Sequence, residues 1–178
     1  MSIFPSRMAI ALLAALFATA APAQDTQPAA VPPAIAATRG QITNLPLPRF
    51  VSMRAEEGNA RRGPSLSHRI DWVFKRRNIP LIVTAEHGHW RRVEDIDGQG
   101  GWMHYSLLSG VRTAIVEQDV ILRAQPALNA QGVAQFQAGV IAQLLECTPD
   151  WCRLRASRQR GWVPKEVIWG VRADEVFE

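Results

Sequence analysis

Apolar and polar residues alternate with a period of two in several short runs of this chain, which is the period of a β-strand with one buried face. The run 50–55 alternates in this way, and Ile70, Trp72 and Phe74 occupy every second position of the next run. The run 80–85 is apolar and rich in β-branched residues. No run shows sustained helical periodicity, so the pattern predicts an all-β protein of short strands in small barrels or sandwiches.

The strand-and-turn pattern occurs twice. The first copy contains Trp90-Arg91-Arg92-Val93 followed by Gly101-Trp102-Met103, and the second contains Trp151-Cys152-Arg153-Leu154 followed by Gly161-Trp162-Val163. The offset between matching tryptophans is 61 residues for the first pair and 60 for the second. A near-constant offset indicates duplication, so we expect two tandem units, residues 49–110 and 111–178.

The first 48 residues differ from the repeats in composition. Residues 1–23 have one arginine, a short apolar core and an Ala-Pro-Ala end, which is the pattern of a secretory signal peptide. Residues 24–48 are rich in Ala and Pro and nearly uncharged, which predicts a disordered leader. We therefore expect a periplasmic or secreted protein with no membrane span after signal cleavage.

The two cysteines lie five positions apart. Cys147 and Cys152 flank Thr-Pro-Asp-Trp, a turn sequence between two apolar runs. In an oxidising compartment this arrangement favours a disulfide across a hairpin, whereas a redox-active pair has a Cys-x-x-Cys spacing at a helix start. The spacing predicts a structural disulfide.

The formal net charge of +4 is unevenly distributed. Residues 49–110 carry an excess of +3, nearly all of it arginine, and residues 111–178 are balanced. This excess is too small and too scattered to indicate nucleic-acid binding. Arginine pairs gathered on one face of a sheet would form a cationic patch that could bind carboxylates or phosphates. Alternation along a strand instead places adjacent arginines on opposite faces, which favours arginines spread over both faces.

Each repeat resembles a bacterial SH3-like domain. The first has that family's three sequence blocks in order: Ala60-Arg61-Arg62-Gly63-Pro64-Ser65, Gly88-His89-Trp90-Arg91-Arg92-Val93 and Gly101-Trp102-Met103. The second departs at the opening block, where Gln125 replaces the glycine and Ala127 the serine. The whole chain is similar to tandem exported SH3 domain-containing proteins of Gram-negative bacteria.

The resemblance implies a strongly bent barrel of five or six strands for each repeat, and binding rather than catalysis. Bacterial members of this family are thought to bind peptidoglycan peptides or protein segments. The expected function is therefore non-catalytic recognition of an extended peptide or of a cell-envelope component such as peptidoglycan. The alternative is a scaffold that joins envelope proteins.

Six tryptophans offer two interpretations, an aromatic groove for an extended peptide or packing inside and between the repeats. Trp72 and Trp169 lack counterparts in the other repeat, so either could serve the contact between repeats. On the groove interpretation, the expected ligand-binding residues all come from the first repeat. They are Trp72, Trp90, Arg91, Trp102, His104 and Tyr105.

Metal and catalytic chemistry have weaker support. His87 and His89 flank a turn glycine, but the sequence shows no third ligand of the kind a zinc site needs. The sequence has no Gly-x-Ser-x-Gly elbow, P-loop or dinucleotide motif. We expect no metal, no cofactor and no enzymatic activity, and a metal- or thiol-dependent enzyme is the third and least favoured hypothesis.

Overall fold

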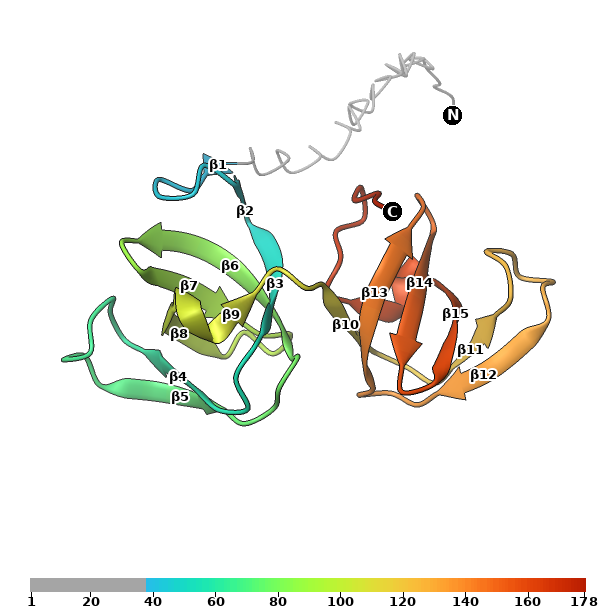
Figure 1. The fold of residues 1–178 in the computed structure, drawn as a ribbon, viewed down its shortest axis with the longest axis horizontal. Helices are drawn as coiled ribbons and strands as arrows, with labels where there is room; N and C mark the ends of the chain where they lie inside the picture. Colours follow the sequence, from blue (N-terminus) through green and yellow to red (C-terminus); the bar gives the residue numbers. More distant parts are fainter. Residues whose placement is uncertain (1–37) are drawn as a thin grey trace, which may run out of the picture. The chain divides into compact units, whose positions relative to one another are not determined.

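The computed structural model describes residues 38–178, and these form two separate antiparallel sheets and a short N-terminal hairpin (Figure 1). The hairpin pairs β1 (Thr38–Arg39) with β2 (Pro46–Leu47). The predicted signal peptide and most of the predicted leader lie outside the described residues. Within residues 38–178, no helix has the length and apolar character needed to cross a membrane.

The first sheet belongs to the first repeat and has the strand order β5-β4-β8-β7-β6-β3-β9. Its strands are β3 (Arg49–Met53), β4 (Gly58–Arg61), β5 (Ile70–Phe74), β6 (Pro80–His87), β7 (Trp90–Glu94), β8 (Gly100–His104) and β9 (Leu108–Ser109). A single 3-10 turn, η1 (Tyr105–Leu107), connects β8 to β9.

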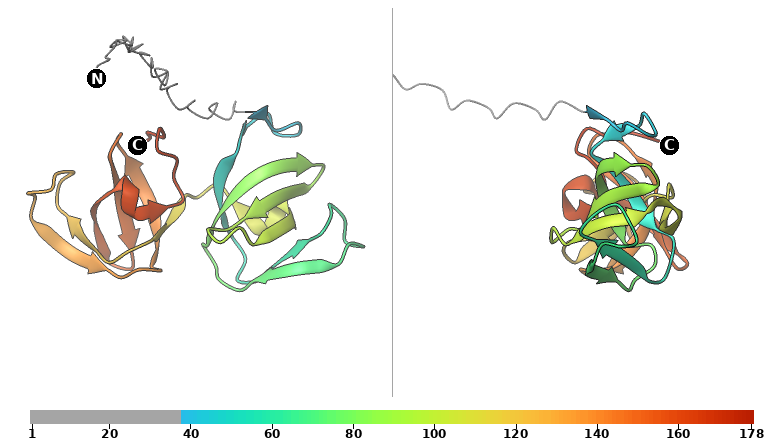
Figure 2. Two further views of the ribbon diagram at one scale, coloured as in Figure 1. Left: turned by 180° about the vertical axis from the view of Figure 1, so that it is seen from behind. Right: turned by 90° about the vertical axis from the view of Figure 1, so that its left-hand side faces the viewer.

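The second sheet repeats this arrangement in the order β12-β11-β15-β14-β13-β10-β16. Its strands are β10 (Thr113–Val116), β11 (Val120–Arg123), β12 (Gly132–Phe136), β13 (Ile141–Cys147), β14 (Trp151–Ala156), β15 (Gln159–Pro164) and β16 (Ile168–Trp169). The turn η2 (Lys165–Val167) corresponds to η1. Seen from behind, each sheet curves around its own interior (Figure 2).

Each sheet has its own apolar core, made by the alternate positions that the sequence pattern placed on one face. In the first repeat, Met53, Leu81, Val83, Val93 and Met103 are fully buried. The core of the second repeat includes Leu122, Leu144, Leu154, Val163 and Val167. The prediction of an all-β protein with two tandem units is therefore confirmed.

Three expectations need correction. Neither sheet closes into a barrel, because the end strands of each seven-stranded sheet do not pair with each other. Residues 38–48, expected to be disordered leader, form the β1–β2 hairpin, and Leu47 is buried in the first core. The alternation of 70–74 buries only Phe74: β5 is the end strand of the sheet, and Ile70 and Trp72 remain exposed.

The N-terminal hairpin is held by one buried carboxylate. Glu86, near the end of β6, accepts hydrogen bonds from the backbone N–H groups of Ile42 and Thr43, at 3.0 and 2.9 Å. It also accepts from the Thr43 hydroxyl at 2.6 Å and from the Arg49 guanidinium at 2.7 Å. Gly40 fits here because a Cβ at that position would lie 2.3 Å from a Glu86 oxygen.

Trp169 makes the contact between repeats that the sequence left open. Its ring packs edge-on against that of Phe50, with 5.0 Å between centroids. Thr113 of β10 donates to the Asn78 carbonyl at 2.7 Å and shares a hydrogen bond with Ser52. Of the two tryptophans without a repeat counterpart, Trp169 therefore has the inter-repeat role.

Candidate functional site

An aromatic cluster lies at one end of the first sheet, where the β6–β7 turn meets η1. Trp90 pairs directly with His104 across β7 and β8, so both side chains lie on one face of the sheet. The His104 ring lies 5.6 Å from Trp90 and 4.9 Å from Tyr105, and His89 lies 5.7 Å from Tyr105. The structure thus gathers three of the residues proposed from the sequence and adds His89.

Of the other predicted ligand-binding residues, Arg91 reaches the cluster, with its guanidinium carbon 6.0 Å from the centre of the Tyr105 ring, whereas Trp102 and Trp72 do not join it. Trp102 precedes His104 on β8, and the centroid of its ring lies 6.5 Å from that of His87. Within the described residues, the ring contact of Trp72 is with Phe74, at 6.4 Å. The six residues therefore do not form a single groove.

Arg91 points into the protein, although it was expected to bind a ligand. It is 7% exposed, and its guanidinium donates to the carbonyl groups of Gly88 and Trp90. Its Nε lies 3.5 Å from the Glu86 carboxylate. Alternation places Arg91 on the inner face and Arg92 on the outer face, so the geometry favours a structural role for Arg91 in the β6–β7 hairpin.

The Glu86 carboxylate is strongly stabilised in its ionised form. Burial by itself would raise its pKa, but the hydrogen bonds from Thr43, Arg49 and Ile42 lower the pKa to about 2. At neutral pH an ionised Glu86 therefore holds the N-terminal hairpin and pairs with Arg91 beside the turn that carries His89.

The sequence raised the histidines as candidate metal ligands. Within residues 38–178, no group of three or more His, Cys, Asp or Glu side chains is placed to hold a metal ion. His104 instead shares a hydrogen bond with the Ser106 hydroxyl at 2.7 Å, at the start of η1.

The second repeat has a cleft of about 550 Å³, which the sequence did not indicate. Its apolar lining comes from Pro149, Trp151, Pro164, Ile168 and Leu128, and Leu128 extends from the β11–β12 loop. Asp150, Lys165 and Glu166 supply the charged groups. An open depression with an indole, two prolines and few polar groups has the chemistry of a peptide-binding site.

The cleft and the aromatic cluster occupy the same place in the two repeats. Trp151 pairs with Pro164 as Trp90 pairs with His104. The Lys165 amide donates to the Asp150 carbonyl, as the Tyr105 amide donates to that of His89. In the first repeat this place carries packed imidazole and phenol rings, whereas the second has two prolines and an open cleft.

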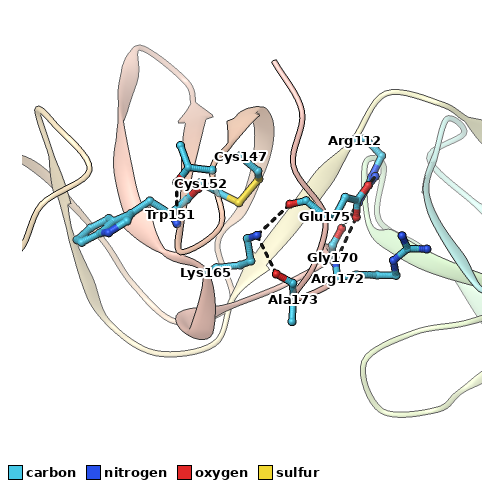
Figure 3. The surroundings of a disulfide bond; sticks show 10 residues. Arg112, Cys147, Trp151, Cys152, Lys165, Gly170, Arg172, Ala173 and Glu175 are labelled. Atoms are coloured by element: carbon cyan, nitrogen blue, oxygen red, sulfur yellow. Dashed lines mark hydrogen bonds and ion pairs between the residues drawn. A yellow bond between two sulfur atoms is a disulfide. The ribbon is translucent and has the colours of Figure 1, made fainter. Parts of the chain in front are cut away.

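The predicted disulfide is present, and it closes the turn that supplies part of the cleft lining; Figure 3 shows the bond beside Trp151. Cys147 and Cys152 face each other across β13 and β14, and the turn between them contains the cleft residues Pro149, Asp150 and Trp151. The backbone of Cys147 also pairs with that of Phe177 near the C-terminus. The disulfide thus fixes the end of the β13–β14 hairpin, which carries the cleft residues, and it lies beside the C-terminal segment.

Lys165 is a buried cation at the base of the cleft. It is 8% exposed, and its Nζ donates to the carbonyl groups of Ala173 and Glu175 at 3.1 and 2.9 Å (Figure 3). These bonds hold the segment that follows β16 against the cleft. The Glu175 carboxylate accepts hydrogen bonds from the Arg112 guanidinium and from the Arg172 amide. Burial by itself would raise the pKa of Glu175, but these hydrogen bonds lower it.

The chain thus consists of two small all-β domains in tandem, and the second has a cleft large enough for part of a peptide. Residues 54–110 and 116–170 each match the sequence pattern of the bacterial SH3 domain. The two matches cover more than half of the chain, which therefore belongs to the bacterial SH3 domain family. Members of this family are typically binding modules, often for cell-wall components.

Comparison with solved structures gave distant similarities. NlpC1 from Trichomonas vaginalis is 10% identical with a TM-score of 0.33, over 76% of this chain and 49% of that one. NlpC2 from the same organism is also 10% identical with a TM-score of 0.33, over 68% and 48%. The chain spans about half the length of these proteins. A search of curated protein sequences gave no match.

Proposed function

We propose that this chain is an exported, non-catalytic binding protein whose second SH3 domain binds an extended peptide of the cell envelope, with peptidoglycan peptides as the expected ligand. The observation that carries the proposal is the cleft around Trp151. Its volume accommodates a few peptide residues, and its indole and proline walls supply apolar contact area.

The charges around the cleft narrow the ligand chemistry. Asp150 and Glu166 are exposed carboxylates at the cleft, so they favour a ligand that bears a positively charged amine. Lys165 has three N–H donors and uses two on protein carbonyl groups, which leaves one for a ligand oxygen. The expected ligand is therefore a peptide with an apolar segment and an amino group.

The N-terminal sequence and the disulfide support a periplasmic location. Residues 1–23 have the composition of a signal peptide, and a structural disulfide forms in an oxidising compartment such as the periplasm. A periplasmic location would place the cleft in the same compartment as peptidoglycan.

The test is co-sedimentation of the purified protein with isolated peptidoglycan at low and moderate salt. Trp151→Ala should reduce the bound fraction strongly, because truncating a central aromatic contact commonly costs about 2 kcal/mol or more of binding free energy. Trp90→Ala, the matched change in the first repeat, should leave binding nearly unchanged.

Two outcomes would oppose the proposal. Equal losses for both variants would argue against assignment to the second repeat. Absence of binding at either salt would reject peptidoglycan as the ligand and leave a protein partner, as the scaffold hypothesis expects.

A further inference from the structure

The β14–β15 hairpin is unusually rich in arginine. Four of its eight residues between positions 153 and 160 are arginines, and none is acidic. They are Arg153, Arg155, Arg158 and Arg160. None of them lines the cleft around Trp151, so this hairpin is a separate feature of the second repeat.

The strand register brings two of these cations face to face. Arg155 on β14 pairs directly with Arg160 on β15, so the two side chains lie on the same face of the hairpin. Leu154, between Arg153 and Arg155, is fully buried, which places Arg153 and Arg155 on the outer face. Like charges directly opposite each other destabilise a strand pair.

Protein carboxylates do not relieve this repulsion. Among residues 38–178, the hairpin's one ion pair is the contact of Arg153 with Glu146 at 3.8 Å. Arg155 donates to the neutral Gln143 side chain at 2.6 Å. Arg62 and Arg69 of the first repeat, in contrast, share the carboxylate of Asp71.

The fold itself does not require the facing arginines. In the first repeat the equivalent register pairs Glu94 with Gly100. A side chain at Gly100 would collide with the Val93 carbonyl, since a Cβ there would lie 1.9 Å from that oxygen. The first repeat thus has one acidic residue and no facing cations at this register, so facing arginines are not a general requirement of the duplicated fold.

We propose that Arg155 and Arg160 bind a phosphate-type oxyanion, with Arg153 and Arg158 as flanking cations. Guanidinium groups present N–H donors in a planar fork that matches phosphate oxygens, and two facing forks can hold one anion between them. Bound anion replaces the repulsion between Arg155 and Arg160 with two charge-assisted contacts. This site lies outside the cleft and is independent of the proposed peptide function.

The test compares two variants of equal charge in the full chain. Arg155→Gln/Arg160→Gln removes the facing pair, and Arg62→Gln/Arg92→Gln removes two exposed arginines from the first repeat. Arg92 is the counterpart of Arg153, and both residues pair with a tryptophan on the neighbouring strand. Two probes are used. Binding of pyrophosphate is measured by calorimetry, and binding of vesicles of phosphatidylglycerol in phosphatidylcholine is measured by sedimentation.

We expect the Arg155/Arg160 variant to lose about tenfold or more in affinity for at least one probe, with little change for the Arg62/Arg92 variant. An effect on pyrophosphate alone would identify a site for a free anion, and an effect on vesicles identifies the phosphate of a lipid headgroup. Equal losses in both variants, or no binding of either probe by the unaltered protein, would overturn the proposal. Circular dichroism of both variants verifies that they remain folded.

Discussion

Glu86 and Arg91 face each other across the β6–β7 hairpin at the positions that Cys147 and Cys152 occupy across β13–β14. In the first repeat an ion pair joins the two strands, with Arg91 Nε 3.5 Å from Glu86 Oε1. In the second repeat a disulfide joins them at the same register. The duplicated fold therefore closes the same hairpin with two different chemistries.

Each of these links also supports a terminal segment of the chain. Glu86 accepts the hydrogen bonds that dock residues 40–44, and the backbone of Cys147 pairs with Phe177. The hairpin end is thus the place where each repeat attaches an additional segment. This shared function explains why both repeats strengthen the hairpin at this register.

Glu86→Gln should destabilise the first repeat. The substitution removes the negative charge and leaves the Arg49 and Arg91 guanidiniums without their buried carboxylate. Breaking a buried ion pair by removing one partner typically costs about 3–5 kcal/mol in the free energy of unfolding. Urea unfolding measures this loss, and hydrogen exchange should show lost protection at the Ile42 and Thr43 amides.

The control for this change is Glu94→Gln on the neighbouring strand. Glu94 is partly exposed and its contact with Arg92 is long, at 3.7 Å. Exposed ion pairs contribute about 1 kcal/mol or less, so this variant should unfold nearly as the unaltered protein does. Similar losses for both variants would contradict a special role of Glu86.

Stability should fall at acidic pH because of the same carboxylate. The pKa of Glu86 is about 2 in the folded protein, below its ordinary value of 4.5, so the unfolded chain binds the proton at higher pH. The stabilisation is complete above pH 4.5 and is lost as the pH falls from 4.5 towards 2. The expected loss is about 3 kcal/mol.

The measurement is urea unfolding between pH 7 and pH 2 for the unaltered protein and for Glu86→Gln. Asp71 and Glu175 also have lowered pKa values, but they are present in both proteins and their effects cancel in the difference. The difference in stability between the two proteins should shrink below pH 4.5. A constant difference across this range would show that Glu86 is not the titrating group.

Most of the strands could be predicted from the sequence because alternation and turn residues are local signals. The run 70–74 became the strand β5, and the runs 50–55 and 80–85 overlap β3 and β6. Residues 38–48 were missed because their order depends on Glu86, a partner about forty residues away. No local pattern reveals a long-range contact of this kind.

The candidate site was less predictable than the fold. The aromatic residues of the first repeat are conspicuous in the sequence, and two of them, Trp90 and Tyr105, do gather around His104. The cleft of the second repeat was missed because Asp150, Pro164 and Lys165 stand where the first repeat has the aromatic rings of His89, His104 and Tyr105. It also depends on the approach of a loop that carries Leu128. Arg91 and Arg92 are adjacent in the sequence, and only the strand orientation distinguishes the buried residue from the exposed one.

Removal of the disulfide should weaken both the second repeat and its cleft. The closed loop of six residues restricts the unfolded chain, which predicts a stabilisation of about 2 kcal/mol. Cys147→Ser/Cys152→Ser should therefore unfold at lower urea concentration and bind peptidoglycan less tightly, because Trp151 lies in the released turn. A reducing agent should reproduce the effect in the unaltered protein and leave the double variant unchanged. Full binding by the double variant would show that the turn holds its shape without the bond.

Lys165→Met should loosen the C-terminal segment without disturbing the strands. Methionine retains most of the apolar stem but cannot donate to the carbonyl groups of Ala173 and Glu175, which lose their partner. Loss of hydrogen bonds from a charged donor predicts a destabilisation of about 1.5–3 kcal/mol. Hydrogen exchange should show lost protection at the Phe177 amide, which bonds to Cys147, while the β14–β15 amides stay protected. Lys75→Met, at an exposed position of the first repeat, should leave both stability and exchange unchanged. Unchanged protection at Phe177 in Lys165→Met would mean that the Cys147 pairing alone holds the segment and that the buried ammonium serves the cleft instead.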